Sequence, residues 1–164
     1  MTHPERAQPA GDDSSAARYL EEFEVGQAWS SSTATVDTAE IKRFAAEFDP
    51  QPFHLDEAAA AQSLFGGLAA SGWHTAAVTM RLLVESEVVP AGGILGVGVD
   101  ELRWPRPVRP GDVLRVESEV LDVRPSRSRP GTGIVKLRAS TLNQNGEIVQ
   151  TFVANLMVPA RSAT

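Results

Sequence analysis

The stretch 48-FDPQPFHLD-56 places an acid, an amide and an imidazole close together in the chain. Asp49 and His54 are the candidate catalytic residues, because a carboxylate and an imidazole at a set separation can take a proton from water and deliver one to a substrate. Prolines flank Gln51 and disfavour helical conformation at Asp49 and Gln51, so a stiff, extended connector is expected. The same stiffness suits an ordinary corner between two helices, and the spacing alone leaves both interpretations open.

Other chemistries have weaker support in the sequence. The chain contains no cysteine, and its three histidines include no pair at the i, i+4 spacing of zinc hydrolases, so no metal site is expected. Ser71 precedes Gly72, but it is not part of the G-x-S-x-G pattern that presents a serine nucleophile. His74 begins an apolar segment and is expected to be buried and bonded to a backbone carbonyl.

Length and composition indicate one ordinary globular domain of 164 residues, 42% hydrophobic and 22% charged. No apolar run approaches the roughly 20 residues of a membrane span, and the polar N-terminus does not resemble a signal peptide, so a cytoplasmic protein is expected. Residues 1–17 are predicted to form a disordered tail and residues 18–160 the folded domain. The net charge of -6 argues against nucleic acid binding, although seven arginines within 103–129 would suit a small anionic ligand.

Three helical segments are predicted. The capping box 37-DTAE-40 begins a helix with one buried apolar stripe at the i, i+3, i+4, i+7 spacing. Its members are Ile41, Phe44, Ala45 and Phe48. Asp56 can cap a short helix over residues 57–63. The segment 73–86 is apolar nearly all round, which is typical of a helix in the centre of a fold.

The remaining segments alternate like β-strands. Strands are expected at residues 31–36, near residue 100, and at 113–123, 134–142 and 147–158. Turns are predicted at 109-RPGD-112, as a type II turn, and at 145-NG-146. Together these elements predict an α+β fold, a curved antiparallel sheet of about five strands wrapped around one long central helix. Because such a sheet has an open edge, a homodimer formed edge to edge is expected.

The run 44-FAAEFDPQPFHLD-56 resembles the hydratase motif of the MaoC-like dehydratases, the (R)-specific enoyl-CoA hydratases. That motif reads aromatic, then Asp-x-Asn-Pro-aliphatic-His-x-Asp. The segments 65–83, 103–112 and 126–147 also resemble the family, in the same order, so the resemblance covers residues from about 19 to 158. It implies a single hotdog domain, in which a curved sheet encloses the central helix.

The resemblance also implies an activity, the reversible addition of water to the α,β double bond of an acyl-CoA or acyl-carrier-protein thioester. The family needs no metal or redox cofactor. Its aspartate and histidine, here Asp49 and His54, hold one water between them. Its oxyanion donor is a backbone N–H that corresponds to Gly72. Ser71, Gln51 and Phe53 complete the predicted oxyanion and substrate-binding set; Gln51 stands where the family has asparagine, and Phe53 replaces a smaller aliphatic residue.

Two alternatives remain open from the sequence. Hotdog folds also hydrolyse acyl-CoA, since a carboxylate can direct water to the thioester carbonyl instead of Cβ. The second alternative is a non-catalytic subunit that binds acyl thioesters. The proline-framed D-x4-H spacing favours hydration over thioester hydrolysis, and tight acyl-CoA binding without turnover would support the non-catalytic subunit.

Overall fold

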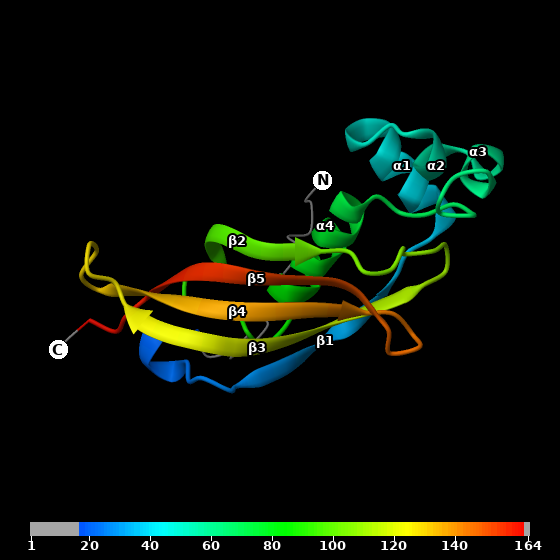
Figure 1. Cartoon of the computed structure of the whole chain (residues 1–164). Coiled ribbons are helices and arrows are strands. Elements are labelled where there is room, and N and C mark those ends of the chain that lie inside the picture. Colours follow the sequence, from blue (N-terminus) through cyan, green and yellow to red (C-terminus); the bar gives the residue numbers. More distant parts are fainter. Residues whose placement is uncertain (1–16, 163–164) are drawn as a thin grey trace, which may run out of the picture.

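The structure is a computed structural model, and it describes residues 17–162. Five strands form one antiparallel sheet in the order β1-β3-β4-β5-β2, which confirms the predicted α+β class (Figure 1). The elements in chain order are η1 (Leu20–Glu22), β1 (Ala28–Thr35), α1 (Thr38–Phe48), α2 (Pro52–Leu55), α3 (Glu57–Ala61), α4 (Gly72–Val84), β2 (Leu95–Arg103), β3 (Val113–Pro125), β4 (Thr132–Leu142) and β5 (Ile148–Pro159). Residues 1–16 of the predicted tail lie outside the described residues.

Alternate residues of a strand point to the same side of a sheet. The concave face is apolar because these alternate positions carry apolar residues. Its most buried members on β3 and β4 are Leu114, Val116, Val120, Val135, Leu137 and Ala139. The helix α4 lies against this face and adds Leu82 and Leu83 to the core (Figure 1). The predicted arrangement of a sheet around a central helix is therefore correct.

One side of α4 is open to solvent in the single chain. Trp73, Met80 and Val84 are 59%, 40% and 52% exposed, although all three are apolar. The helix is central as predicted, but its apolar surface is not buried on this side. The sheet curves far enough to cover only one face of the helix.

The helices α1, α2 and α3 gather beyond one end of the sheet (Figure 1). The capping box at the start of α1 is confirmed, with the Glu40 N–H donating to Asp37 Oδ1 over 2.8 Å. Ile41 and Ala45 are fully buried as predicted, but Phe48 is 64% exposed. The buried stripe ends early because the last turn of α1 projects past the core.

The connector after α1 is only partly extended. Asp49 and Gln51 have non-helical backbone angles, as expected from the prolines that follow them. Residues 52–55 instead make the helical turn α2, so the prediction of a wholly extended segment is wrong. Pro52 occupies the first position of that turn. An N–H at this position would have no acceptor within the helix, so proline costs no hydrogen bond there.

Both predicted turns are confirmed. Gly111 has φ +87°, which a type II turn requires, and the Asp112 N–H donates to the Arg109 carbonyl over 3.1 Å. Gly146 has φ +74° in the turn between β4 and β5. Within residues 17–162, no helix has the length and apolar character needed to cross a membrane.

Candidate active site

Asp49 lies immediately after α1, where it ends the helix, and its carboxylate is held by two side chains. Oδ1 accepts a 2.6 Å hydrogen bond from Nε2 of Gln51, and Oδ2 accepts a 2.7 Å hydrogen bond from Oγ of Ser71. The Asp49 side chain keeps 18% of its surface exposed. The carboxylate is thus fixed in orientation while part of it stays accessible.

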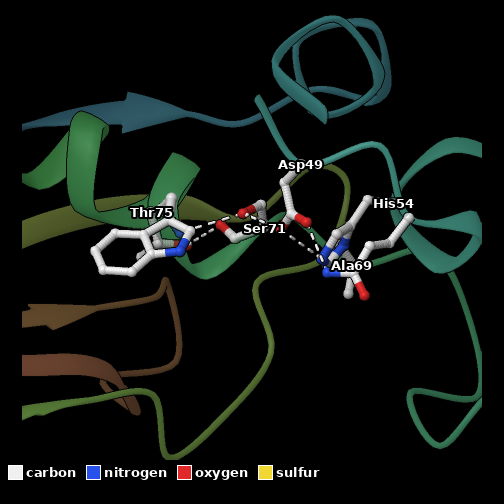
Figure 2. A network of polar contacts seen from close by, with 7 residues as sticks. Asp49, His54, Ala69, Ser71 and Thr75 are labelled. Atoms are coloured by element: carbon white, nitrogen blue, oxygen red, sulfur yellow. Dashed lines mark hydrogen bonds and ion pairs between the residues drawn. The ribbon is translucent and has the colours of Figure 1, made fainter. Parts of the chain in front are cut away.

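His54 lies in the turn α2 and is 4% exposed. Its Nδ1 is 2.6 Å from the carbonyl oxygen of Ala69, which can only accept, so Nδ1 carries the proton. The opposite nitrogen, Nε2, lies 3.4 Å from Oδ2 of Asp49. Figure 2 shows Asp49 between Ser71 and His54, with Ala69 on the far side of the imidazole. The two residues that were predicted from the D-x4-H spacing are therefore brought together.

Hydrogen bonding favours the charged form of Asp49. Burial opposes ionisation, but the hydrogen bonds from Ser71 and Gln51, together with the positive charge of the His54 ring in its protonated form, outweigh it. The pKa of Asp49 is consequently lower than that of an ordinary aspartate. The site therefore presents a carboxylate beside an imidazole nitrogen that is free of its proton when the ring is neutral.

The N-terminus of α4 forms the next part of the site. Ser71 is the N-cap: its Oγ accepts a 3.2 Å hydrogen bond from the Trp73 N–H while donating to Asp49. Gly72 follows as the first helical residue. A helix begins with backbone N–H groups that no carbonyl of the same helix accepts, and its dipole favours negative charge there.

Asp49, His54 and Gly72 line one cavity of about 300 Å³. Its other lining residues are Phe65, Ala70, Trp73, Thr75, Trp104, Pro105, Arg106, Pro107 and Val108. Ser71, Gln51 and Phe53 are not among them. Ser71 and Gln51 touch the Asp49 carboxylate from outside the cavity, and Phe53 packs edge-on against the His54 ring with centroids 4.6 Å apart.

Sequence reasoning missed Arg109, which shapes the loop before α4. Its guanidinium donates to the carbonyl of Gly67 over 2.8 Å, to that of Leu68 over 3.3 Å, and to that of Phe65. The next residue along the loop, Ala69, supplies the carbonyl that orients His54. The 109-RPGD-112 turn gave a sequence signal for the backbone but none for this side chain.

His74 departs from its prediction. It is 8% exposed, but within residues 17–162 it forms no hydrogen bond to a backbone carbonyl, and its buried Nδ1 has no partner among those residues. The ring stacks on Phe44 instead, with centroids 4.8 Å apart and planes 8° from parallel. Burial lowers the pKa of His74 despite the opposing charge of Glu40, so the neutral ring is favoured.

Comparison with known proteins agrees with this fold. A family model described as MaoC like domain matches residues 22–142. The crystal structure of the MaoC-like dehydratase from Rhodospirillum rubrum has a TM-score of 0.86 and 56% identity, covering 90% of this chain and 100% of that chain. The uncharacterized protein YdeM of Bacillus subtilis is 37% identical over 85% of this chain and 96% of its own length. The 3-hydroxybutyryl-CoA dehydratase of Methylorubrum extorquens is 31% identical over 87% of this chain and 85% of its own length.

A curved antiparallel sheet against one central helix is the hotdog fold, which the solved relatives share. Within that class, the chain belongs to the MaoC-like dehydratase family. Relatives named for hydratase and dehydratase chemistry lie in the same family.

Proposed function

We propose that this protein catalyses the reversible hydration of trans-2-enoyl-CoA to (R)-3-hydroxyacyl-CoA. The observation that supports this most is the 3.4 Å approach of His54 Nε2 to Asp49 Oδ2 inside the cavity that Gly72 also lines. It combines two groups that handle protons with a backbone donor at a helix N-terminus. The dehydratase relative of Methylorubrum extorquens supports the same class of reaction.

The proposed chemistry needs one water molecule held by Asp49 and His54. The water oxygen forms a bond to Cβ while a water proton passes to one member of the pair. The electrons of the double bond move toward the thioester oxygen, and a proton returned to Cα by the pair completes the hydroxyacyl product. Either group can act as the base, because one oxygen of Asp49 and one nitrogen of His54 face each other at the same place.

The thioester oxygen gains negative charge as water attacks Cβ. The backbone N–H of Gly72 is the proposed donor to that oxygen, and the N-terminus of α4 adds its favourable dipole. The reaction changes no net oxidation state and needs no electrophilic metal in this scheme. Activity should therefore survive exhaustive dialysis against a chelator.

We propose a homodimer formed through β2, which is an edge strand of the sheet. Leu95, Val97 and Val99 on this strand are each more than half exposed. An exposed apolar edge of this kind favours pairing with another strand. The open face of α4 would contribute Trp73, Met80 and Val84 to the same interface region.

The experiment that tests the proposed function mixes the purified protein with crotonyl-CoA and follows loss of the enoyl-thioester absorbance. Chiral analysis of the product and a free-thiol assay run alongside. Formation of (R)-3-hydroxybutyryl-CoA without free thiol is expected. Thiol release would indicate a thioesterase instead, and binding without turnover of crotonyl-CoA or longer enoyl-CoAs would indicate a non-catalytic subunit.

A further inference from the structure

Trp104 lies directly against the first turn of α4. A Cβ atom added to Gly72 would stand 2.6 Å from Cε2 and 2.8 Å from Cδ2 of Trp104, so only glycine leaves room for this indole. The ring also meets Trp73 edge to face, with centroids 5.3 Å apart and planes at 79°. Both tryptophans line the cavity that contains Asp49 and His54. Trp104 thus forms a cavity wall beside the backbone of Gly72.

A chain of hydrogen bonds holds the indole in this place. Nε1 of Trp104 donates to Oε1 of Gln150 over 2.8 Å, and Nε2 of Gln150 donates to Oγ1 of Thr79 over 3.0 Å. The Thr79 hydroxyl uses its one proton on the carbonyl of Thr75 over 2.8 Å. Thr141, whose Oγ1 is 2.6 Å away, must therefore be the donor to Thr79.

These three residues, Gln150, Thr79 and Thr141, form a buried anchor in which each side-chain N or O atom has a hydrogen-bond partner. Gln150, Thr79 and Thr141 are all 0% exposed. Burying an amide costs free energy unless its polar atoms are hydrogen-bonded. Here the hydrogen bonds also fix the orientation of the Gln150 amide. Since Thr79 is on α4 and Gln150 on β5, the ring of Trp104 is oriented by the helix that begins at Gly72 and by the sheet. Thr141 on β4 contacts Thr79 and bonds neither Gln150 nor Trp104.

We propose that Trp104 determines which acyl groups the cavity admits and that Gln150 is the positioning residue that fixes the Trp104 ring. This assignment rests on the proposed hydratase function. An indole held against Gly72 limits the space beside the thioester carbonyl, where the first carbons of the acyl chain would lie. The preferred substrates are therefore short-chain enoyl thioesters, and the preference depends on an anchor outside the cavity.

The test compares kcat/KM for crotonyl-CoA and trans-2-octenoyl-CoA. Wild-type protein should favour crotonyl-CoA. Trp104→Ala should raise the octenoyl-to-crotonyl ratio by about tenfold or more, in keeping with the effect of pocket contacts on discrimination between homologous substrates. Trp104→Phe, which keeps most of the wall, should shift the ratio less and serves as the second variant if the alanine protein does not fold.

Gln150→Leu removes the hydrogen bond that holds the Trp104 ring but keeps the Trp104 side chain itself. It should shift the substrate ratio in the same direction as Trp104→Ala. Thr141→Val is the matched control, because it removes a buried hydroxyl from the same network without touching Trp104, and its ratio should stay at the wild-type value. An equal shift in Thr141→Val and Gln150→Leu would assign the effect to stability and overturn the positioning role.

Indole N–H exchange gives a second readout that does not need activity. The chain has three tryptophans, and within residues 17–162 the indole N–H of Trp104 is the one bonded to a protein acceptor. One indole proton signal should therefore exchange slowly with solvent, and Gln150→Leu should remove its protection.

The outcomes separate the two proposals. Hydration of crotonyl-CoA with an unchanged substrate ratio in Trp104→Ala would overturn the assignment of Trp104 and leave the hydratase function standing. A wild-type protein that hydrates neither substrate would overturn the hydratase function and this assignment with it.

Discussion

The hydroxyl of Ser71 connects the start of α4 to Asp49. Its Oγ donates to Asp49 Oδ2 over 2.7 Å and accepts from the Trp73 N–H over 3.2 Å. One side chain therefore caps the central helix and holds the carboxylate that faces His54. The stability of α4 and the ionisation of Asp49 are consequently linked through a single hydroxyl group.

Ser71→Ala should change the pH dependence of the reaction. The Ser71 hydrogen bond stabilises the charged form of Asp49, so its loss should raise the pKa of Asp49. The acid limb of the kcat/KM profile should then move to higher pH, and loss of the cap should lower the free energy of unfolding by about 1 kcal/mol. Ser86→Ala, near the opposite end of α4, is the control, and an unmoved acid limb in Ser71→Ala would contradict the link.

Asp49→Asn should remove the proton-handling carboxylate while keeping its shape. We expect kcat/KM for crotonyl-CoA to fall by a factor of about 10² to 10⁴, the usual contribution of a general acid or base. Far-ultraviolet circular dichroism should stay unchanged, because the amide oxygen can still accept from Ser71. Glu47→Gln removes an exposed negative charge of α1 and should retain activity; wild-type rates in Asp49→Asn would exclude the proposed mechanism.

His54→Asn tests the roles of the two imidazole nitrogens separately. The shorter amide can still donate toward the Ala69 carbonyl, but no atom replaces Nε2 beside Asp49. A loss of kcat/KM of about 10² to 10⁴ is expected, with the fold intact by circular dichroism. Retained hydration would mean that Asp49 alone activates the water.

Arg109→Lys should loosen the loop that carries Ala69. A lysine ammonium cannot reproduce the fork that serves the carbonyls of Gly67, Leu68 and Phe65. In urea denaturation, the free energy of unfolding should fall by about 1.5 to 3 kcal/mol, the range for hydrogen bonds to a charged group. The kcat should also fall, because His54 loses its orientation. Arg127→Lys, on an exposed turn, should change neither quantity.

His74→Phe should flatten the dependence of stability on pH. Because the pKa of His74 is lowered by burial, the unfolded chain takes up a proton at a higher pH than the folded chain does. Wild-type stability should therefore be greatest above the ordinary histidine pKa of about 6.5 and decline as the pH falls below it. The phenylalanine variant keeps the stack on Phe44 and should show less of this decline in denaturation at pH 5 and pH 8.

The sequence by itself indicated most of the helices and strands and the two residues proposed to be catalytic. The capping box at Asp37, the alternation along β3 and β4, and the glycine of the 109–112 turn each act over a few residues, so local patterns were sufficient to predict them. Asp49 and His54 lie in one proline-framed segment, so the sequence could offer them as candidates, and the resemblance to the family favoured the catalytic interpretation.

Only the tertiary structure decided which contacts join distant residues around the site. Ser71 reaches Asp49 across 22 positions of the chain, and Arg109 reaches the Gly67 carbonyl across 42. Gln150 and Thr79 are 71 positions apart, and their polar side chains in the core follow no sequence period. These contacts depend on where the helix and the sheet meet, which is set by the packing of the whole core rather than by any local pattern.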